Sequence, residues 1–237
     1  FYIIFATRLG MVRKNKLIEV AKSGQRSLRE TGKTAIKLKI NDELISVINC
    51  NDNYDAFLST TDGKCIRFPV SKIRLISTLN SQGVRGIKLK GSNKVISMSI
   101  LNHSPIDISI RKEYLKFANE MRKNHSDKFK NDEFQRLNQN EEFILSITNK
   151  GYGKKSSAYE YRITSRGGSG ITGILTKQKN GKVVDSFIVK ENDEIILVTN
   201  GGKLIRVSVK DVRIAGRTTQ GVSIFKIPQN EEIVSVS

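Results

Sequence analysis

The stretch TSRGGSGITG, from Thr164 to Gly173, decides between two very different folds. Gly168, Gly170 and Gly173 fit the pattern G-x-G-x-x-G, which forms a tight turn against a pyrophosphate in dinucleotide-binding folds. Such a site requires a helix directly after the glycines, because the helix N-terminus holds the phosphates. The residues that follow here, ILTKQKNGKVVDSFIV, instead alternate and turn in the manner of a β-hairpin. The pattern therefore predicts glycines that serve a turn between strands.

The same kind of stretch recurs along the chain at a fixed spacing. TGKTAIKL, SQGVRGIKL, GSGITGIL and TQGVSIF begin at residues 31, 81, 168 and 219. Gly32 and Gly83 are 51 residues apart. Gly170 and Gly221 repeat that spacing of 51, whereas Gly83 and Gly170 are 87 residues apart. The chain is therefore expected to hold four units, with 36 extra residues between the second and the third.

Each unit also contains a hairpin motif and a closing apolar stretch. The hairpins are FATRLGMVRKNKL, STTDGKCIRFPV, SITNKGYGKKSSA and LVTNGGKLIRVSV, each with a glycine turn before a basic second strand. The closing stretches are NDELISV, SNKVISM, GKVVDSF and NEEIVSV. Several short strands in a unit of about 40–50 residues are typical of propeller blades. We therefore predict a single all-β, propeller-like domain over residues 1–237.

The inserted segment, residues 102–142, differs in kind from the repeats. Its apolar side chains follow a helical stripe, and it carries eight basic and eight acidic residues. The stripe consists of Ile110, Tyr114, Phe117, Ala118 and Met121. We predict a partly helical insertion, and its zero net charge predicts that its removal leaves the affinity for a polyanion nearly unchanged.

Positive charge belongs to the repeats. The chain has 41 Lys and Arg against 23 Asp and Glu, a net charge of +18. Residues 1–101 carry a net charge of +11 and residues 143–237 carry +7, so the insertion contributes nothing to the surplus. Charge that recurs with each unit makes a curved basic track, which suits nucleic acid. A membrane partner would favour a basic amphipathic helix, and the helical segment here is neutral.

The aromatic residues favour duplex over single-stranded nucleic acid. Tryptophan is absent, and Phe68, Phe187 and Phe225 are expected in the core. Single-strand and RNA platforms instead alternate exposed aromatic and basic side chains for base stacking. We therefore expect contacts with the phosphate backbone of duplex DNA.

Two sets of basic residues recur in the units and are the candidate DNA contacts. The first set lies on the second hairpin strand, where we expect its side chains to point outward while Val12, Ile66 and Ile205 pack inward. The second set lies near the later turn. The first set is Arg13, Lys14, Arg67, Lys154, Lys155 and Arg206, and the second is Arg74, Arg85, Arg162, Arg166, Arg213 and Arg217.

Other chemistry has little support in the sequence. Cys50 and Cys65 are isolated, and His103 and His125 lack neighbouring ligands, so we expect no metal site and reduced thiols in a cytoplasmic protein. The acidic NDE motifs fall in predicted turns, which disfavours a hydrolase built on paired carboxylates. No apolar run approaches the length of a membrane span. The chain begins at Phe1 inside a predicted strand, so we expect a fragment of a longer protein.

The units resemble the C-terminal domain of the DNA gyrase A subunit family. The matching stretches are FATRLGMVRKN, GKTAIKLKINDELISV, DGKCIRF, QGVRGIKL, NKGYGKKSSAYEYRITSRGG and GRTTQGVSIF, and they cover nearly all of the chain except the insertion. The resemblance implies a β-pinwheel, a propeller-like ring of six blades that exchange strands and bind DNA around the outer rim. This chain would supply the last four of the six blades.

The resemblance also implies a function. It points to a non-catalytic DNA-wrapping domain of a type II topoisomerase that introduces negative supercoils with ATP. ATP, magnesium and the catalytic tyrosine would belong to other parts of that enzyme, and the partner would be the gyrase B subunit in an A2B2 tetramer. The alternatives are the equivalent domain of topoisomerase IV and a propeller-type protein-interaction module.

One motif departs from the family. SRGGSG, at residues 165–170, imitates the family's Q-R-R-G-G-K-G box, but Ser165 and Ser169 replace basic residues. It also lies in a later repeat than the box should occupy. We interpret it as a basic turn on the rim, with Arg166 as one phosphate contact among many.

Overall fold

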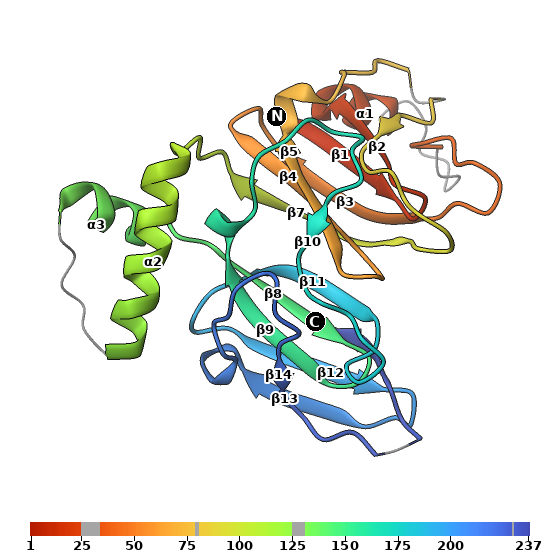
Figure 1. The fold of residues 1–237 in the computed structure, drawn as a ribbon. Helices are drawn as coiled ribbons and strands as arrows, with labels where there is room; N and C mark the ends of the chain where they lie inside the picture. The colour runs from red at the N-terminus through yellow and green to blue at the C-terminus, as the bar shows by residue number, and fades with distance from the viewer. Residues whose placement is uncertain (25–33, 79–80, 125–130, 229) are drawn as a thin grey trace.

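The computed structural model describes residues 1–24, 34–78, 81–124, 131–228 and 230–237. These residues form four small antiparallel sheets and a helical projection (Figure 1). The first two sheets occupy the upper part of the view and the last two the lower part, while α2 and α3 project to one side. The predicted four-unit, propeller-like β architecture is confirmed.

Each sheet is built around one of the predicted hairpins. The hairpins are β1 (Tyr2–Thr7) with β2 (Met11–Lys16), β4 (Tyr54–Thr60) with β5 (Lys64–Pro69), β8 (Phe143–Thr148) with β9 (Tyr152–Ser157), and β12 (Glu194–Thr199) with β13 (Leu204–Ser208). Gly10, Gly63, Gly151 and Gly202 turn them with φ between 74° and 84°. Glycine is required there because a Cβ disfavours this left-handed conformation.

The closing stretch of each unit forms the innermost strand of its sheet. These strands are β3 (Leu44–Cys50), β7 (Val95–Asn102), β11 (Val183–Val189) and β15 (Ile233–Val236). Each pairs with the first strand of its own hairpin. Contacts run from β3 to β7, from β7 to β11 and from β11 to β15, so this edge of every sheet faces its neighbours. The opposite edge of each sheet therefore faces outward.

The outer edge strand of a sheet comes from the following unit. β6 (Val84–Arg85) pairs with β2, β10 (Ile171–Thr172) with β5, and β14 (Val222–Ser223) with β9. The sheet orders are thus β3-β1-β2-β6, β10-β5-β4-β7 and β11-β8-β9-β14. The last sheet contains three described strands, in the order β13-β12-β15. Neighbouring blades exchange strands, as the resemblance implied.

This pairing corrects one expectation from the sequence. The residues after TSRGGSG were expected to turn as a hairpin, but β10 pairs with β5 of the preceding unit. The Gly173 amide donates to the Gly63 carbonyl at 2.8 Å, so the contact between the two units extends one residue beyond β10. In the first unit, Gly32 lies outside the described residues, and residues 34–40 form no strand.

Apolar side chains from successive blades share their cores. Ile4 and Val12 of the first blade pack in one cluster with Leu58 and Phe68 of the second. Phe57 of the second blade packs in another cluster with Ile144 of the third. A third cluster joins β8, β11 and the last blade. Burial of such side chains contributes about 1.5–3 kcal/mol each, and sharing them fixes one blade against the next.

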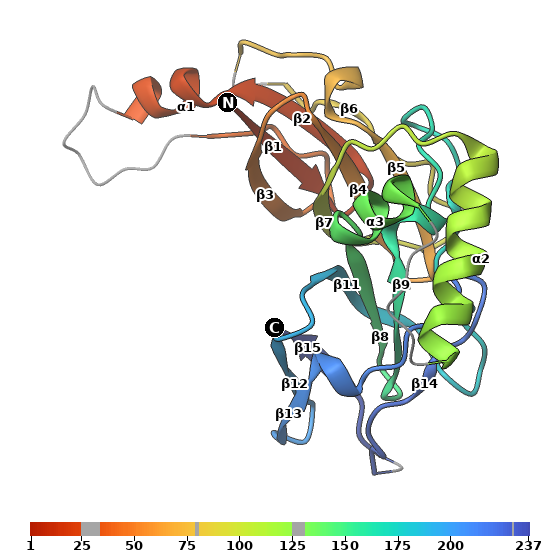
Figure 2. The same ribbon diagram turned by 90° about the vertical axis from the view of Figure 1, so that its left-hand side faces the viewer.

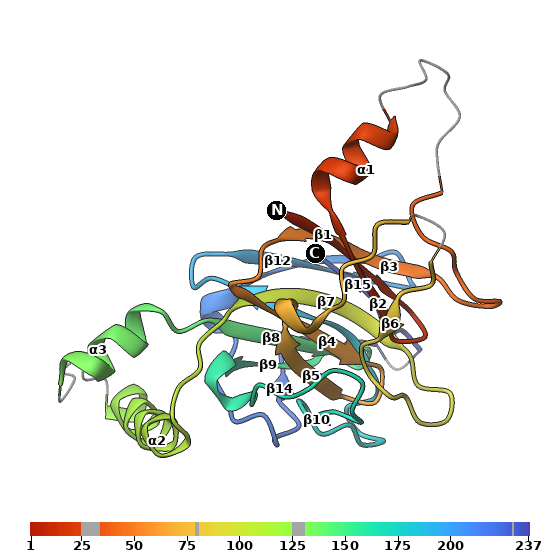
Figure 3. The same ribbon diagram turned by 90° about the horizontal axis from the view of Figure 1, so that it is seen from above.

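The insertion forms two helices that pack on each other. α2 (Ile108–Asn124) and α3 (Asp132–Gln139) enclose Tyr114, Ala118 and Phe134. Figure 3 shows α2 nearly end-on and to one side of the sheets. The predicted helical stripe is confirmed. A further short helix, α1 (Leu17–Gly24), was not predicted and extends away from the first blade (Figure 2).

Candidate nucleic-acid interface

Three connecting segments build the outer edge of the molecule. They begin with the short 3₁₀ helices η1 (Val70–Lys72), η2 (Ala158–Glu160) and η3 (Val209–Asp211) and end at the glycine before each edge strand. We call residues 70–78 with 81–83, residues 158–170 and residues 209–221 the crossover segments, and these segments with their edge strands the rim. Each crossover segment lies along the second strand of the preceding hairpin. The bridges pair Lys14 with Leu75, Arg67 with Ile163, and Lys155 with Ile214.

Most of the first set of candidate residues lies beneath these segments. The five members in the first three blades are at most 4% exposed: Arg13, Lys14, Arg67, Lys154 and Lys155. The expectation that they point outward is wrong. The second strand is enclosed, since the shared core packs against it and the following crossover segment bridges to its backbone.

The buried basic groups bind protein atoms. Arg67 Nε forms an ion pair with Asp55 at 2.8 Å, and its terminal nitrogens donate to the carbonyls of Ala158 and Asn102 at 2.9 and 2.8 Å. Lys154 Nζ donates to the Gly216 carbonyl at 2.6 Å. These bonds fasten a crossover segment to the hairpin below it. Their role is therefore structural, and they cannot contact a bound polymer in this conformation.

Arg206 is the exception in the first set. It lies four residues after its hairpin glycine, as Lys14, Arg67 and Lys155 do. Its side chain is 69% exposed, and its Nε pairs with Glu194 at 2.8 Å. No described crossover segment covers it. The comparison shows that the covering segment, and not the strand itself, buries this position.

The second set supplies the accessible cations. Arg74, Arg162 and Arg213 occupy the same place in their crossover segments, each one residue before the bridge to the strand below. All three are exposed. None of their side chains forms a hydrogen bond or an ion pair with a described residue. Three consecutive units therefore present an unpartnered guanidinium at one repeated position on the rim. Arg85, on β6, is also exposed.

Arg166 and Arg217 have a different role on the same rim. Arg166 donates to the carbonyls of Arg85 and Lys72, both at 3.1 Å. Arg217 donates to the Thr172 carbonyl at 2.9 Å. Arg85 and Thr172 are equivalent edge-strand residues, two positions after Gly83 and Gly170. Both arginines are half-buried and join the edge strand of one blade to the crossover segment of the next.

One group of lysines and one arginine near the rim were not predicted from the sequence. Exposed lysines follow the edge strands within five to nine residues of the repeated glycine. They are Lys88, Lys90, Lys177, Lys179 and Lys226. Their recurrence after the glycine was a usable signal. The other missed residue is Arg111 in the insertion, whose position only the fold reveals.

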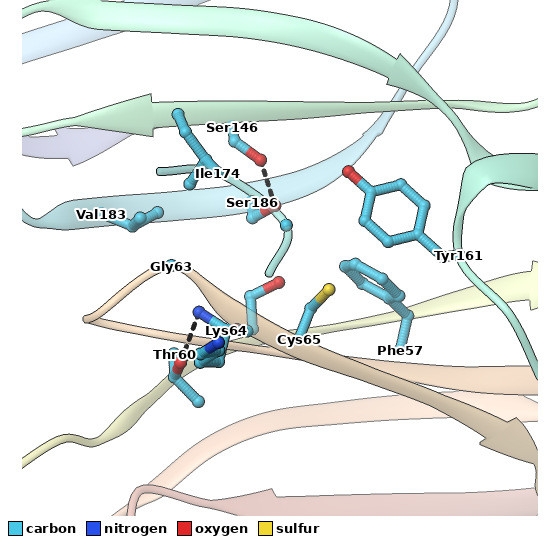
Figure 4. A pocket seen from close by; sticks show the side chains of 12 residues that line it. Phe57, Thr60, Gly63, Lys64, Cys65, Ser146, Tyr161, Ile174, Val183 and Ser186 are labelled. Atoms are coloured by element: carbon cyan, nitrogen blue, oxygen red, sulfur yellow. Dashed lines mark hydrogen bonds between the residues drawn. The ribbon is translucent and has the colours of Figure 1, made fainter. Parts of the chain in front are cut away.

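The described residues offer little for other chemistry. A cavity of about 10 Å³ between the second and third blades is lined by Phe57, Cys65 and Tyr161, beside a bond of 2.8 Å between Ser146 and Ser186 (Figure 4). That volume suits one water molecule at most. Burial raises the pKa of the Cys65 thiol to about 12, which keeps it an unreactive thiol at neutral pH.

The part of the chain that the structure describes contains no group of three or more His, Cys, Asp and Glu side chains placed to share a metal ion. His125 lies outside it. None of its helices has the length and apolarity needed to cross a bilayer.

Comparison with known proteins agrees with this geometry. The chain is similar to the DNA gyrase A subunit of Rickettsia conorii, at 42% identity over 246 residues, and to that of Granulibacter bethesdensis, at 35% over 260. Each match covers 99% of this chain and 27% of the relative, so the chain spans about a quarter of these proteins.

Two solved structures share the fold. One is described as the structure of DNA gyrase A C-terminal domain, with a TM-score of 0.71, 22% identity, and coverage of 99% of this chain and 64% of that one. The other is the crystal structure of the C-terminal domain of DNA topoisomerase IV, with a TM-score of 0.76, 21% identity, and coverage of 100% and 61%.

The family match follows the four units that the glycine spacing defined. Residues 2–51, 55–102, 142–190 and 193–237 match the family described as DNA gyrase C-terminal domain, beta-propeller. The insertion falls in the gap between the second and third matches. On its repeats, its fold and this match, the chain belongs to the DNA gyrase C-terminal domain family.

Proposed function

We propose that this chain is a non-catalytic domain that binds duplex DNA along its rim and bends it. The observation that carries the proposal is the repeated exposure of Arg74, Arg162 and Arg213 without protein partners among the described residues. Guanidinium groups bind phosphate through paired hydrogen bonds. Because one such group lies on each of three blades, the groups can contact several phosphates along one DNA backbone. Backbone contacts of this kind position DNA without reading its sequence.

The domain would serve a larger enzyme. We propose that it wraps DNA for a gyrase-type topoisomerase, in which ATP, magnesium and strand cleavage belong to other domains or to a partner, the gyrase B subunit, in the cytoplasm. The gyrase names of the relatives at 35–42% identity support gyrase over topoisomerase IV, since the topoisomerase IV likeness is one of fold at 21% identity.

Salt dependence tests the proposal. If roughly eight phosphates are neutralised, log K for a duplex of mixed sequence should fall against log salt with a slope near −7. The triple variant Arg74→Gln/Arg162→Gln/Arg213→Gln should have a slope about three units shallower. Fluorescence anisotropy over a salt series measures both, and two duplexes of unrelated sequence should bind alike.

A matched control distinguishes the loss of rim contacts from the loss of net positive charge. Lys94→Gln/Lys182→Gln/Lys190→Gln removes the same charge next to the inner strands β7 and β11. It should change the slope by less than about one unit. A wild-type slope shallower than about −2 would refute duplex wrapping, and equal losses in the two triple variants would refute the rim as its location.

A further inference from the structure

A cavity joins the insertion to the rim. It has a volume of about 560 Å³ and lies between the start of α2 and the second crossover segment. Arg67, His103, Asp107, Arg111 and Arg162 contribute charged or titratable side chains to its wall. Arg162 is the middle one of the three repeated rim arginines, so the cavity opens at the candidate DNA track.

The positive charges of this cavity are not all compensated. Asp55 pairs with Arg67 and also contacts His103 Nδ1 at 2.7 Å. The Asp107 carboxylate accepts the Ser109 amide at 2.7 Å and caps the first turn of α2. Arg111 and Arg162 have no hydrogen bond or ion pair from their side chains to any described residue. The guanidinium groups of Arg111 and Arg162 therefore share the cavity with the Asp107 carboxylate, which is already bonded to the first turn of α2.

Arg111 is held among like charges. Burial lowers the pKa of Arg111, and the guanidinium groups of Arg67, Arg162 and Arg217 lower it further. A half-buried cation surrounded by cations is stabilised by an anion that sits between them. The 17-residue helix α2 also points its N-terminus at the cavity, and a helix N-terminus favours negative charge.

The insertion packs against the second crossover segment through Tyr159. Tyr159 of η2 donates its hydroxyl to the Leu137 carbonyl at 3.0 Å, and its ring meets Tyr114 edge to face with centroids 5.6 Å apart. Glu142 accepts the Asn102 amide at 2.9 Å and closes the base of the insertion. α2 is therefore anchored on the element that leads directly into Arg162. The helix that carries Arg111 and the segment that carries Arg162 pack together, and both line the cavity.

We propose that Arg111 and Arg162 together bind a backbone phosphate of duplex DNA at the mouth of this cavity. The inference rests on the proposed function and adds the insertion to the DNA track. It differs from the expectation based on the neutral net charge of the insertion. The charges that act on Arg111 are the guanidinium groups of Arg67, Arg162 and Arg217, and no acidic side chain of the insertion is among them.

Single substitutions test the proposal in the full 237-residue chain. Arg111→Gln should weaken binding to duplex DNA about five- to tenfold at 0.1 M salt and make the salt slope about one unit shallower. The control Lys112→Gln removes the same charge from the next, exposed residue and should change affinity less than about twofold. Circular dichroism and thermal unfolding should show both variants folded.

A double-mutant cycle shows whether the two arginines share one phosphate. If they do, Arg111→Gln/Arg162→Gln should lose less affinity than the product of the two single losses. If Arg111→Gln binds as the wild type does while Arg162→Gln is weakened, the cavity site is refuted and the rim stands. If the wild-type chain shows no salt-dependent binding to duplex DNA, the proposed function fails and this inference fails with it.

Discussion

At the scale of single residues, one sequence position has opposite roles in different blades. Four residues after the hairpin glycine stand Lys14, Arg67 and Lys155, which are buried, and Arg206, which is exposed. The strand pattern alone cannot distinguish them, because the covering segment arrives from the next unit. For this reason the repetition of these basic residues could be read from the sequence, whereas the burial of five of them could not.

Arg67 and Arg206 give a direct test of this difference. Arg67→Ala should lower the free energy of unfolding by about 3–5 kcal/mol, because the buried Asp55 loses its arginine partner and keeps only its contact with His103. Arg206→Ala removes an equivalent pair at the surface and should cost about 1 kcal/mol or less. Urea denaturation measures both values. A loss of similar size in the two variants would contradict the burial that we describe.

Lys154 predicts a dependence of stability on pH. Burial lowers the pKa of Lys154 to about 7, from an ordinary value of 10.5. Above pH 7 the unfolded chain still binds this proton while the folded chain has released it, so the free energy of unfolding should rise with pH. The rise is about 1.4 kcal/mol per pH unit at most.

The measurement is a pair of urea titrations at pH 7.0 and pH 8.5. This interval avoids a contribution from Cys65, whose pKa burial raises from 9.0 to about 12. The raised pKa lowers the free energy of unfolding only above pH 9.0, where the unfolded thiol loses its proton. The increase should be smaller in Lys154→Met by about 1–2 kcal/mol. An identical increase in that variant would show that Lys154 does not titrate in this range.

At the scale of elements, the repeated glycines explain the pattern that resembled a phosphate loop. Gly170 has φ +72°, and a Cβ there would lie 2.5 Å from the Cys65 carbonyl oxygen. Gly168 lacks a positive φ, and its Cβ would meet nothing closer than Ile66 Cδ1 at 3.8 Å. The glycine requirement thus comes from close approach of the edge strand to the preceding hairpin.

Two alanine substitutions check this explanation. Gly170→Ala should lower the free energy of unfolding by about 2–4 kcal/mol, from the left-handed backbone and the clash together. Gly168→Ala should change it by less than about 0.5 kcal/mol. The midpoints of urea denaturation provide the values. Equal tolerance at both positions would argue against the strand pairing at β10.

The elements also show how far the sequence could predict the fold. The hairpins, the inner strands and the helical stripe of the insertion were predictable, because each follows a local period of apolar residues and a glycine turn. β6, β10 and β14 have two residues each, too few to show a period. Their pairing with the preceding unit came from the family resemblance, and no local pattern predicts it. Arg111 could not be predicted, since its neighbours come from another unit.

At the scale of the whole molecule, strand exchange should make the four blades unfold together. Solenoid repeats contact only through separate interfaces and often unfold in stages. Here each of the first three sheets takes a strand from the next unit, and the apolar clusters span neighbouring blades. We expect one calorimetric transition whose van't Hoff enthalpy equals the measured enthalpy. Two resolved transitions would show that the exchanged strands do not couple the blades.

The exchange of strands also determines when each blade can be completed during translation. A blade stays open on its outer side until the ribosome has made the edge strand of the next unit. For the first and third blades this strand follows its partner by about 70 residues. For the second blade the insertion lengthens the interval to 106 residues, from Cys65 to Ile171. At translation rates of about 5–20 residues per second, that blade waits several seconds longer than an interval of 70 residues would require. Its exposed strand edge is therefore where a nascent chain is most open to mispairing and where a chaperone would have the most time to act.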